Sequence, residues 1–113
     1  MFIQERPTTE AIMSYALSAT GIVYYAIPKV LRQLSISNTS GAITFVHIYN
    51  MTTTPTNLDV ATFIFPINGS NNVTFNPFDH QFTSGIAMRA TTSLTGTVSP
   101  VVNSLILNMT LSE

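Results

Sequence analysis

Two histidines and five acidic residues are the main candidates for acid–base chemistry in this chain. Asp79 and His80 are adjacent, and such a pair would need only a serine nucleophile to complete a hydrolytic triad. The sequence has no G-x-S-x-G segment that would present this serine on a strained turn. The pair also lies in an Asn-Pro-rich segment, which favours a hydrogen-bonded loop. We therefore expect a protein that is not an enzyme.

A metal site would have to be built from His47, His80 and Asp79, since two histidines and one carboxylate form a known facial arrangement. Their spacing matches no metal-binding motif, and the chain has no Cys for a thiolate site or a disulfide. His47 is better explained as a hydrogen-bonded residue of a strand. We expect neither a metal nor another cofactor.

Arg89 is the one cation that the sequence places in the middle of an expected strand, between Ala87 and Thr91. It could lie on the surface and cover apolar area with its stem. It could instead lie in an interface and pair with a carboxylate, either Asp59, Asp79 or an acid of a partner. The sequence leaves both interpretations open.

Cations are too few for nucleic-acid binding, because Lys and Arg together number 4 and the net charge is −1. A chain with so few positive charges cannot neutralise many phosphates. Three of the four, Arg6, Lys29 and Arg32, lie in the first third of the chain. They could anchor an N-terminal segment to an acidic partner surface.

The whole composition is unusually poor in charge. Charged residues make up 8% of the 113 residues, against roughly 25% in an average soluble domain. Hydrophobic residues make up 45%, which excludes a disordered chain, and about a quarter of the residues are Ser or Thr. A small domain with so few charges has little electrostatic protection against self-association. We expect self-association to be part of its function.

The N-terminal segment contains Glu5, Arg6 and Pro7, which is not typical of a secretory signal. Residues 11–28 are uncharged and long enough to span a bilayer, but their Ser, Thr, Gly and Tyr content makes a membrane span unexpected. We expect synthesis in the cytoplasm of a host and treat the five Asn-x-Ser/Thr sequons as turn and strand residues. The sequons begin at Asn38, Asn50, Asn68, Asn72 and Asn108.

Short stretches of alternating hydrophobicity, separated by turn residues, predict an all-β fold. The clearest is the last stretch, where Leu105, Leu107 and Met109 would share one face. Asn68-Gly69-Ser70-Asn71 is the strongest turn signal. Strands are expected at about 13–18, 22–27, 34–38, 42–50, 60–67, 72–75, 84–92 and 103–111. This spacing favours an antiparallel β-sandwich or jelly roll of seven to eight strands at 13–113, after an extended arm at 1–12.

Edge strands of such a fold are usually protected by charged side chains. The segments 34–57, 60–78 and 90–112 contain no Lys, Arg, Asp or Glu. Neighbouring subunits could supply the missing protection, which again indicates an assembly.

Two segments resemble small β-sandwich virion proteins of tailed bacteriophages. One is Val46-His47-Ile48-Tyr49-Asn50, followed by a Thr/Pro loop, an apolar strand and a Gly-containing turn. The other runs from Phe82 through Gly85-Ile86-Ala87 to Thr91-Thr92. The resemblance covers roughly residues 42–111 and implies a jelly-roll-like subunit of a repeating particle, often a trimer. By analogy with capsid-cementing proteins, the N-terminal arm would reach across to a neighbour.

The expected function is that of a structural virion protein that decorates or cements a capsid by bridging major capsid subunits. The expected partners are copies of the chain itself, as a homotrimer, and the major capsid protein or other virion proteins. Residues of the arm and of two uncharged loops, together with Arg89, are the candidate interface. They are Met1, Phe2, Ile3, Arg6, Thr53, Pro55, Arg89, Leu94 and Pro100.

The alternative is a tail, fibre or collar component that binds another virion protein, a host receptor or a glycan. Aromatic side chains could form a platform for stacking sugars, but Trp, the usual residue there, is absent. Packing in the core or in an interface is the better explanation of these rings. They are Tyr15, Tyr24, Tyr25, Phe45, Tyr49 and Phe82.

Overall fold

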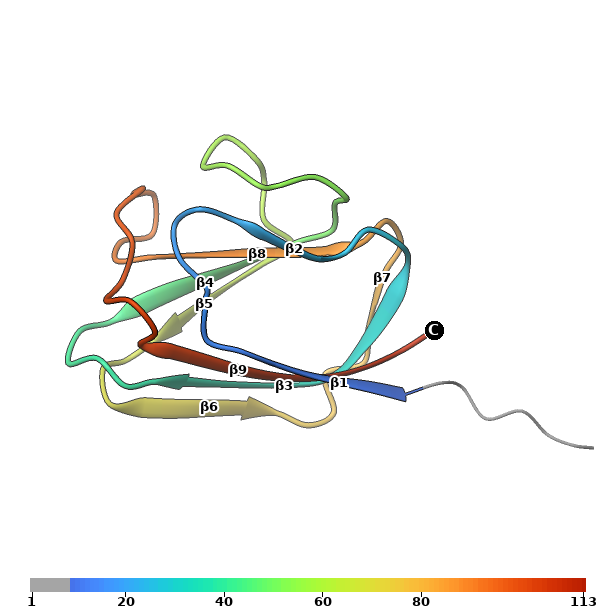
Figure 1. Cartoon of the computed structure of the whole chain (residues 1–113), viewed down its shortest axis with the longest axis horizontal. Helices are drawn as coiled ribbons and strands as arrows, with labels where there is room; N and C mark the ends of the chain where they lie inside the picture. Colours follow the sequence, from blue (N-terminus) through green and yellow to red (C-terminus); the bar gives the residue numbers. More distant parts are fainter. Residues whose placement is uncertain (1–8) are drawn as a thin grey trace, which may run out of the picture.

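A computed structural model describes residues 9–113 and shows two antiparallel β-sheets packed face to face (Figure 1). This confirms the predicted all-β sandwich, with nine strands rather than seven or eight. Sheet A has the order β1-β9-β3-β6, with β7 also paired to β3, and sheet B has the order β2-β8-β4-β5. The strands are β1 (Thr9–Ser14), β2 (Ile22–Tyr25), β3 (Lys29–Asn38), β4 (Thr44–Tyr49), β5 (Phe63–Ile67), β6 (Asn71–Phe75), β7 (His80–Phe82), β8 (Ile86–Thr91) and β9 (Leu105–Ser112).

The strand pairs are nested in the sequence. β4 pairs with β5, β3 with β6 and β7, β2 with β8, and β1 with β9, all antiparallel. The chain therefore forms one long antiparallel ribbon that is wound so that β3 also pairs with β9 and β4 with β8. This winding brings the first and last strands together in sheet A and places β4 and β8 in the middle of sheet B.

The hydrophobic core lies between the sheets and follows the alternation of the sequence. In sheet A, Leu34 of β3 lies opposite Met109 of β9, and Ile36 lies opposite Leu107. All four side chains are buried, as a half-buried strand with period two requires. In sheet B the corresponding residues include Val46, Ile48 and Met88, also fully buried.

The open side between β5 and β6 is filled by aromatic rings. The Phe65 and Phe75 ring centres are 4.6 Å apart, and Phe78 packs edge-on against Phe63 at 5.2 Å. Edge-to-face and tilted contacts of this kind are favoured by the ring quadrupoles. They join the two sheets where no strand pairing does.

Several local predictions differ from the structure. The strand expected at 34–38 begins at Lys29, and the strand expected at 60–67 begins at Phe63. The strand expected at 13–18 lies at Thr9–Ser14, with Ile12 facing the core and Met13 and Tyr15 exposed. Residues 9–12, expected in the arm, are therefore part of β1, which is held by its pairing with β9. β7 (His80–Phe82) lies in a segment that the sequence predicts to be a loop.

Candidate functional site

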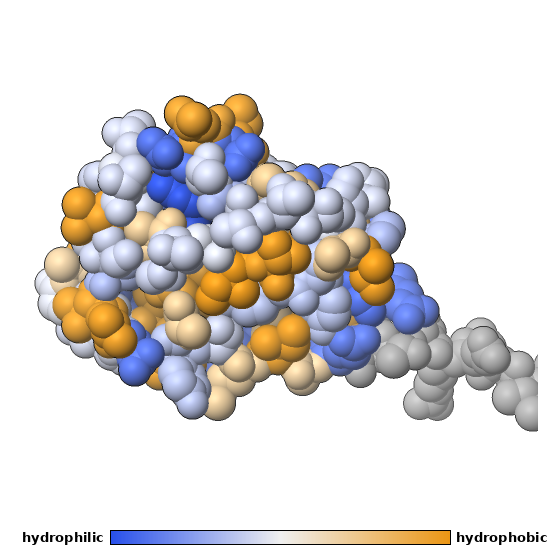
Figure 2. All heavy atoms as spheres, turned by 45° about the horizontal axis from the view of Figure 1, so that its top comes forward, coloured by the Kyte–Doolittle hydropathy of each residue, from blue (hydrophilic) through white to orange (hydrophobic). Residues whose placement is uncertain are grey.

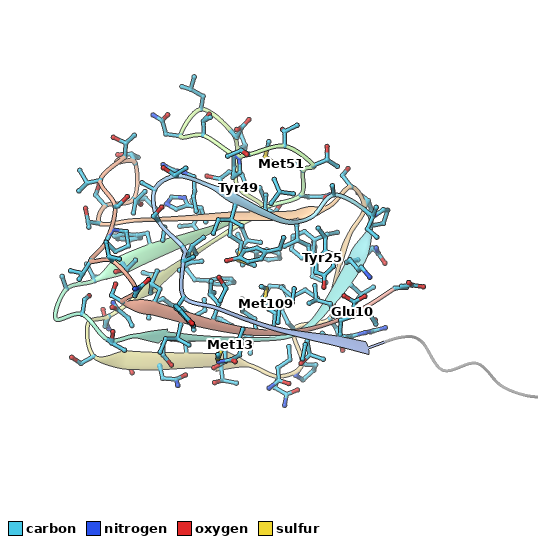
Figure 3. The ribbon with its side chains drawn as sticks, viewed as in Figure 1. Glu10, Met13, Tyr25, Tyr49, Met51 and Met109 are labelled. Carbon is cyan, nitrogen blue, oxygen red and sulfur yellow. The ribbon has the colours of Figure 1, made fainter. Side chains whose placement is uncertain are left out.

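A pocket lies on the outer face of sheet B, away from the core. Strand pairing places His47 of β4 next to Arg89 of β8 on one side and next to Ile64 of β5 on the other. Because side chains alternate along a strand, Tyr49 also belongs to this outer face. Residues of the β4–β5 and β8–β9 loops rise around these side chains and enclose a pocket of about 270 Å³. Tyr49 lies below the β4–β5 loop in Figure 3.

The floor of the pocket contains a buried cation, Arg89. Its side chain is 3% exposed, so the interpretation as a free surface residue is wrong. Nη2 donates a hydrogen bond to the carbonyl oxygen of Gly96 at 3.0 Å, which ties the β8–β9 loop to the sheet. Nε is buried and has no hydrogen-bond partner within the described residues. The site therefore holds a guanidinium with unused donors.

His47 stays neutral beside this cation. Burial lowers its pKa, and the positive charge of Arg89 lowers it further. Its Nε2 lies 2.9 Å from Oγ1 of Thr91, and that hydroxyl donates to the carbonyl oxygen of Ser93 at 2.6 Å. Since the hydroxyl proton is used there, Nε2 must be the donor to Thr91. His47 therefore carries its proton on Nε2, and Nδ1 is a free acceptor.

Tyr49 forms a second, largely apolar part of the floor. Its ring lies nearly parallel to the imidazole of His47, with 6.4 Å between the ring centres. Burial raises the pKa of the phenol, and the nearby Arg89 opposes that rise. The hydroxyl is therefore protonated at neutral pH and available as a donor.

The rim combines polar and apolar residues of the two loops. Asp59 is fixed in the β4–β5 loop, where Oδ2 accepts hydrogen bonds from Thr56 N at 2.8 Å and Thr56 Oγ1 at 3.3 Å. It lines the pocket but forms no ion pair with Arg89 in the described part of the chain. The other lining residues of the loops and of β5 are Asn57, Val60, Ala61, Ile64, Leu94 and Thr95.

The residues considered for catalysis or metal binding do not meet here. Asp79 Oδ1 accepts a hydrogen bond from Arg32 Nη1 at 3.3 Å, so it is not the partner of Arg89. The ring of His80 packs between those of Phe63 and Phe82, at 4.9 and 4.8 Å. Within residues 9–113 no three His, Cys, Asp or Glu side chains are grouped to hold a metal ion.

A second polar cluster closes the end of the sandwich where β1 begins. Lys29 Nζ donates to Oε1 of Glu10 at 3.0 Å, and the Tyr25 hydroxyl donates to Oε2. Figure 3 shows Glu10 and Tyr25 at this same end. The two hydrogen bonds lower the pKa of Glu10, and burial together with Glu10 raises the pKa of Tyr25 to about 12. This cluster is satisfied internally and holds β1 against β2 and β3.

The candidate interface residues fall into three groups. Thr53 and Leu94 are exposed on the β4–β5 and β8–β9 loops. Pro55 and Pro100 are buried by their own chain, so they cannot contact a partner directly, and Arg89 is reached only through the pocket. Four others, Met1, Phe2, Ile3 and Arg6, lie outside the described residues.

Sequence reasoning missed three strongly exposed apolar residues on the two loops that surround the pocket. Leu58 and Val60 are 88% and 92% exposed on the β4–β5 loop, and Val98 is 65% exposed on the β8–β9 loop. Figure 2 shows apolar side chains on the crest above sheet B. The sequence could have indicated these residues, because they are apolar residues within otherwise polar loops. We call Leu58, Val60, Leu94 and Val98 the apolar rim.

Comparisons with protein-family models, curated proteins and solved structures found no match. The described chain has no helix of the length and apolarity needed to cross a membrane. Function must therefore be inferred from the fold and from this pocket with its apolar rim.

Proposed function

We propose that the chain is a structural subunit that docks onto other protein subunits through its apolar rim. The observation that carries the proposal is the nearly complete exposure of Leu58 and Val60 on the β4–β5 loop, of which Val60 lines the pocket. Leaving such side chains in water forgoes about 1.5–3 kcal/mol each relative to burial. Exposed apolar residues that gather around a pocket mark an interaction site.

The specific form we propose is a virion protein of the capsid-decoration type. The nested strand pairs, with β6 and β7 counted as one strand, correspond to the winding of a jelly roll. Viral capsid proteins are among the proteins that use this architecture. The resemblance of residues 42–111 to phage β-sandwich proteins and the low charge also support this form. The mechanism would be repeated weak contacts that act together over a shell.

Self-association tests the first part of this proposal. We expect the purified chain to sediment as a trimer at micromolar concentration. The double variant Leu58→Ser/Val60→Ser should shift the distribution towards monomer without changing the far-UV circular dichroism. Ile27→Ser is the matched control, because Ile27 is also exposed but lies in the β2–β3 turn. A solitary monomer at millimolar concentration would refute self-association as the function.

A test of the proposed role of the N-terminal residues 1–8 requires a deletion that leaves the sandwich intact. Removal of residues 1–8 preserves β1, whereas removal of residues 1–10 would also take away Glu10 and its bonds to Tyr25 and Lys29. If the arm clamps a neighbour, the 1–8 deletion should reduce assembly while the unfolding midpoint stays unchanged. Unchanged assembly would contradict the clamp and leave the apolar rim as the contact.

A further inference from the structure

Arg89 differs from the other cations of the described chain in having no carboxylate partner. Lys29 pairs with Glu10 at 3.0 Å and Arg32 with Asp79 at 3.3 Å. Both pairs form between residues of this chain, and the Arg32–Asp79 pair lies at the surface, where both side chains are about half exposed. Arg89 is the most deeply enclosed of the charges on the outer face of sheet B, yet within residues 9–113 no acid lies within 4 Å of it. A buried charge without a partner is costly, so the site favours an anion.

The donors of Arg89 are only partly used by the protein. A guanidinium has five N–H donors. One donates to the carbonyl oxygen of Gly96, and the guanidinium also faces the hydroxyl of Tyr49, where it opposes the rise that burial causes in the pKa of that phenol. Nε has no hydrogen-bond partner in the described structure. His47, the neighbour of Arg89 on β4, uses its Nε2 proton for Thr91 and makes no hydrogen bond to Arg89 in the described residues. The unused donors therefore favour a ligand that accepts hydrogen bonds and carries negative charge.

The apolar walls and the volume of the pocket indicate which kind of negatively charged group fits it. Val60, Ala61, Ile64 and Leu94 line it with apolar surface, next to the polar floor. A volume of about 270 Å³ is below the usual range for drug-sized ligands, which starts near 300 Å³. Together these features suit a carboxylate on a short aliphatic stem, which is the chemistry of a glutamate or aspartate side chain.

We propose that the pocket receives an acidic side chain from a docked protein partner, with its carboxylate bound by the guanidinium of Arg89. This deepens the docking function proposed above and rests on it. A protein segment is favoured over a free metabolite because Val60 and Leu94, which line the pocket, are 92% and 53% exposed, and Leu58 on the same loop as Val60 is 88% exposed. Residues that flank the acidic side chain would cover this rim and exclude water from the ion pair.

Substitution of Asp59 predicts the direction in which the affinity for an acidic ligand should change. Its carboxylate lines the pocket and repels an incoming acid, while its Oδ2 is engaged by Thr56. The variant Asp59→Asn should bind an acidic probe about two- to fivefold more tightly, as expected for removal of one exposed like charge. Asn keeps the size of the side chain and one oxygen to accept from Thr56.

The experiment is a titration of the full chain with N-acetyl-L-glutamate N-methylamide, followed by the Arg side-chain Nε–H signals in NMR. We expect the Arg89 signal to shift and saturate at millimolar probe, whereas the matched glutamine compound causes no shift. Arg89→Gln should weaken binding at least about tenfold, and Arg89→Lys should retain part of it. Titration with inorganic phosphate separates a carboxylate site from a general anion site, and tighter binding of phosphate would overturn the proposal.

If the Arg89 variants fail to fold, the titrations of the wild-type chain and of Asp59→Asn still test the proposal. Absence of any shift in the wild type, or weaker binding in Asp59→Asn, would overturn it. If assembly depends on Leu58 and Val60 but the probe does not bind, the docking function stands and the acidic occupant is wrong. If the probe binds but the chain never assembles, the pocket is a carboxylate site for a free ligand, and the proposed protein occupant is wrong.

Discussion

The ammonium group of Lys29 lies 3.0 Å from the carboxylate of Glu10 and 4.9 Å from the centre of the Tyr25 ring. Lys29 begins β3 and is almost fully buried, whereas Glu10 lies on the edge strand β1. One carboxylate therefore neutralises the buried cation and also accepts the hydroxyl proton of Tyr25 from β2. The pair holds together three strands at the end of the sandwich where β1 begins.

Acid should loosen this end of the fold. The hydrogen bonds from Tyr25 and Lys29 lower the pKa of Glu10 below its ordinary value of 4.5. A depressed carboxylate pKa stabilises the folded state above the unfolded value, and this contribution is lost as pH falls through the folded pKa. We expect the urea midpoint of the wild type to exceed that of Glu10→Gln at pH 7 and the difference to shrink below pH 4.5. A constant difference down to pH 2.5 would contradict the ionised role of Glu10.

Alkaline conditions should act on the same cluster through Tyr25, whose pKa is raised to about 12. Because the folded pKa exceeds the ordinary value of 10.0, the stabilisation is present below pH 10 and declines as pH rises from 10 towards 12. In Tyr25→Phe this decline should be smaller, although its stability at pH 7 is lower because the bond to Glu10 is lost. Ultraviolet difference absorption at 295 nm should show one fewer late-titrating phenol in the variant.

Mild acid should act on the pocket through His47. Burial and Arg89 lower its pKa below 6.5, so the folded protein resists protonation of this ring. The stabilisation is present above pH 6.5 and is lost as pH falls through the lowered pKa, because the unfolded state then binds more protons. We expect the NMR signal of the His47 ring to titrate below 6.5. His47→Gln should lose less stability than the wild type between pH 6.5 and 5. An identical loss in both proteins would mean that groups other than His47 cause it.

Periodicity predicted the fold best where one face of a strand is buried and the other is in water. The alternation of Leu105, Leu107, Met109 and Leu111 matches the buried positions of β9. The strand that contains His47 carries apolar residues on both faces, a pattern that favours a central strand, and it lies between β8 and β5 in sheet B. The alternation of Met13, Tyr15 and Leu17 with smaller residues predicts that Met13 is buried, and this is wrong. The inward parity of β1 is set by its register with β9, where Ile12 lies opposite Met109.

The candidate site was less predictable because loops, not strands, decide it. Parity alone places His47, Tyr49 and Arg89 outward, and an outward Arg in a sheet is ordinarily exposed. Arg89 is buried only because the β4–β5 and β8–β9 loops fold over it, and the bond to Gly96 depends on that path. No local pattern encodes such a long-range closure. The turn at Asn68–Asn71 was predicted, but it connects β5 in sheet B to β6 in sheet A and so forms no hairpin.

The start of β8 should be intolerant of even one added methyl group. A Cβ on Gly85 would overlap the carbonyl oxygen of Tyr25 and lie 2.8 Å from that of Met51, both of which are backbone atoms. Because neither can move without shifting its own segment, Gly85→Ala should cost about 1–3 kcal/mol of unfolding free energy.

Gly41→Ala is the matched control for this substitution, since nothing lies within 4 Å of a Cβ at that position and its φ is not positive. It should leave stability unchanged or raise it by no more than about 1 kcal/mol, because alanine restricts the unfolded chain. Urea unfolding followed by tyrosine fluorescence measures both variants. Equal stability of the two variants would mean that the chain does not pass between Tyr25 and Met51 as described. The β8 strand that carries Arg89 would then lack the anchor that fixes the floor of the pocket.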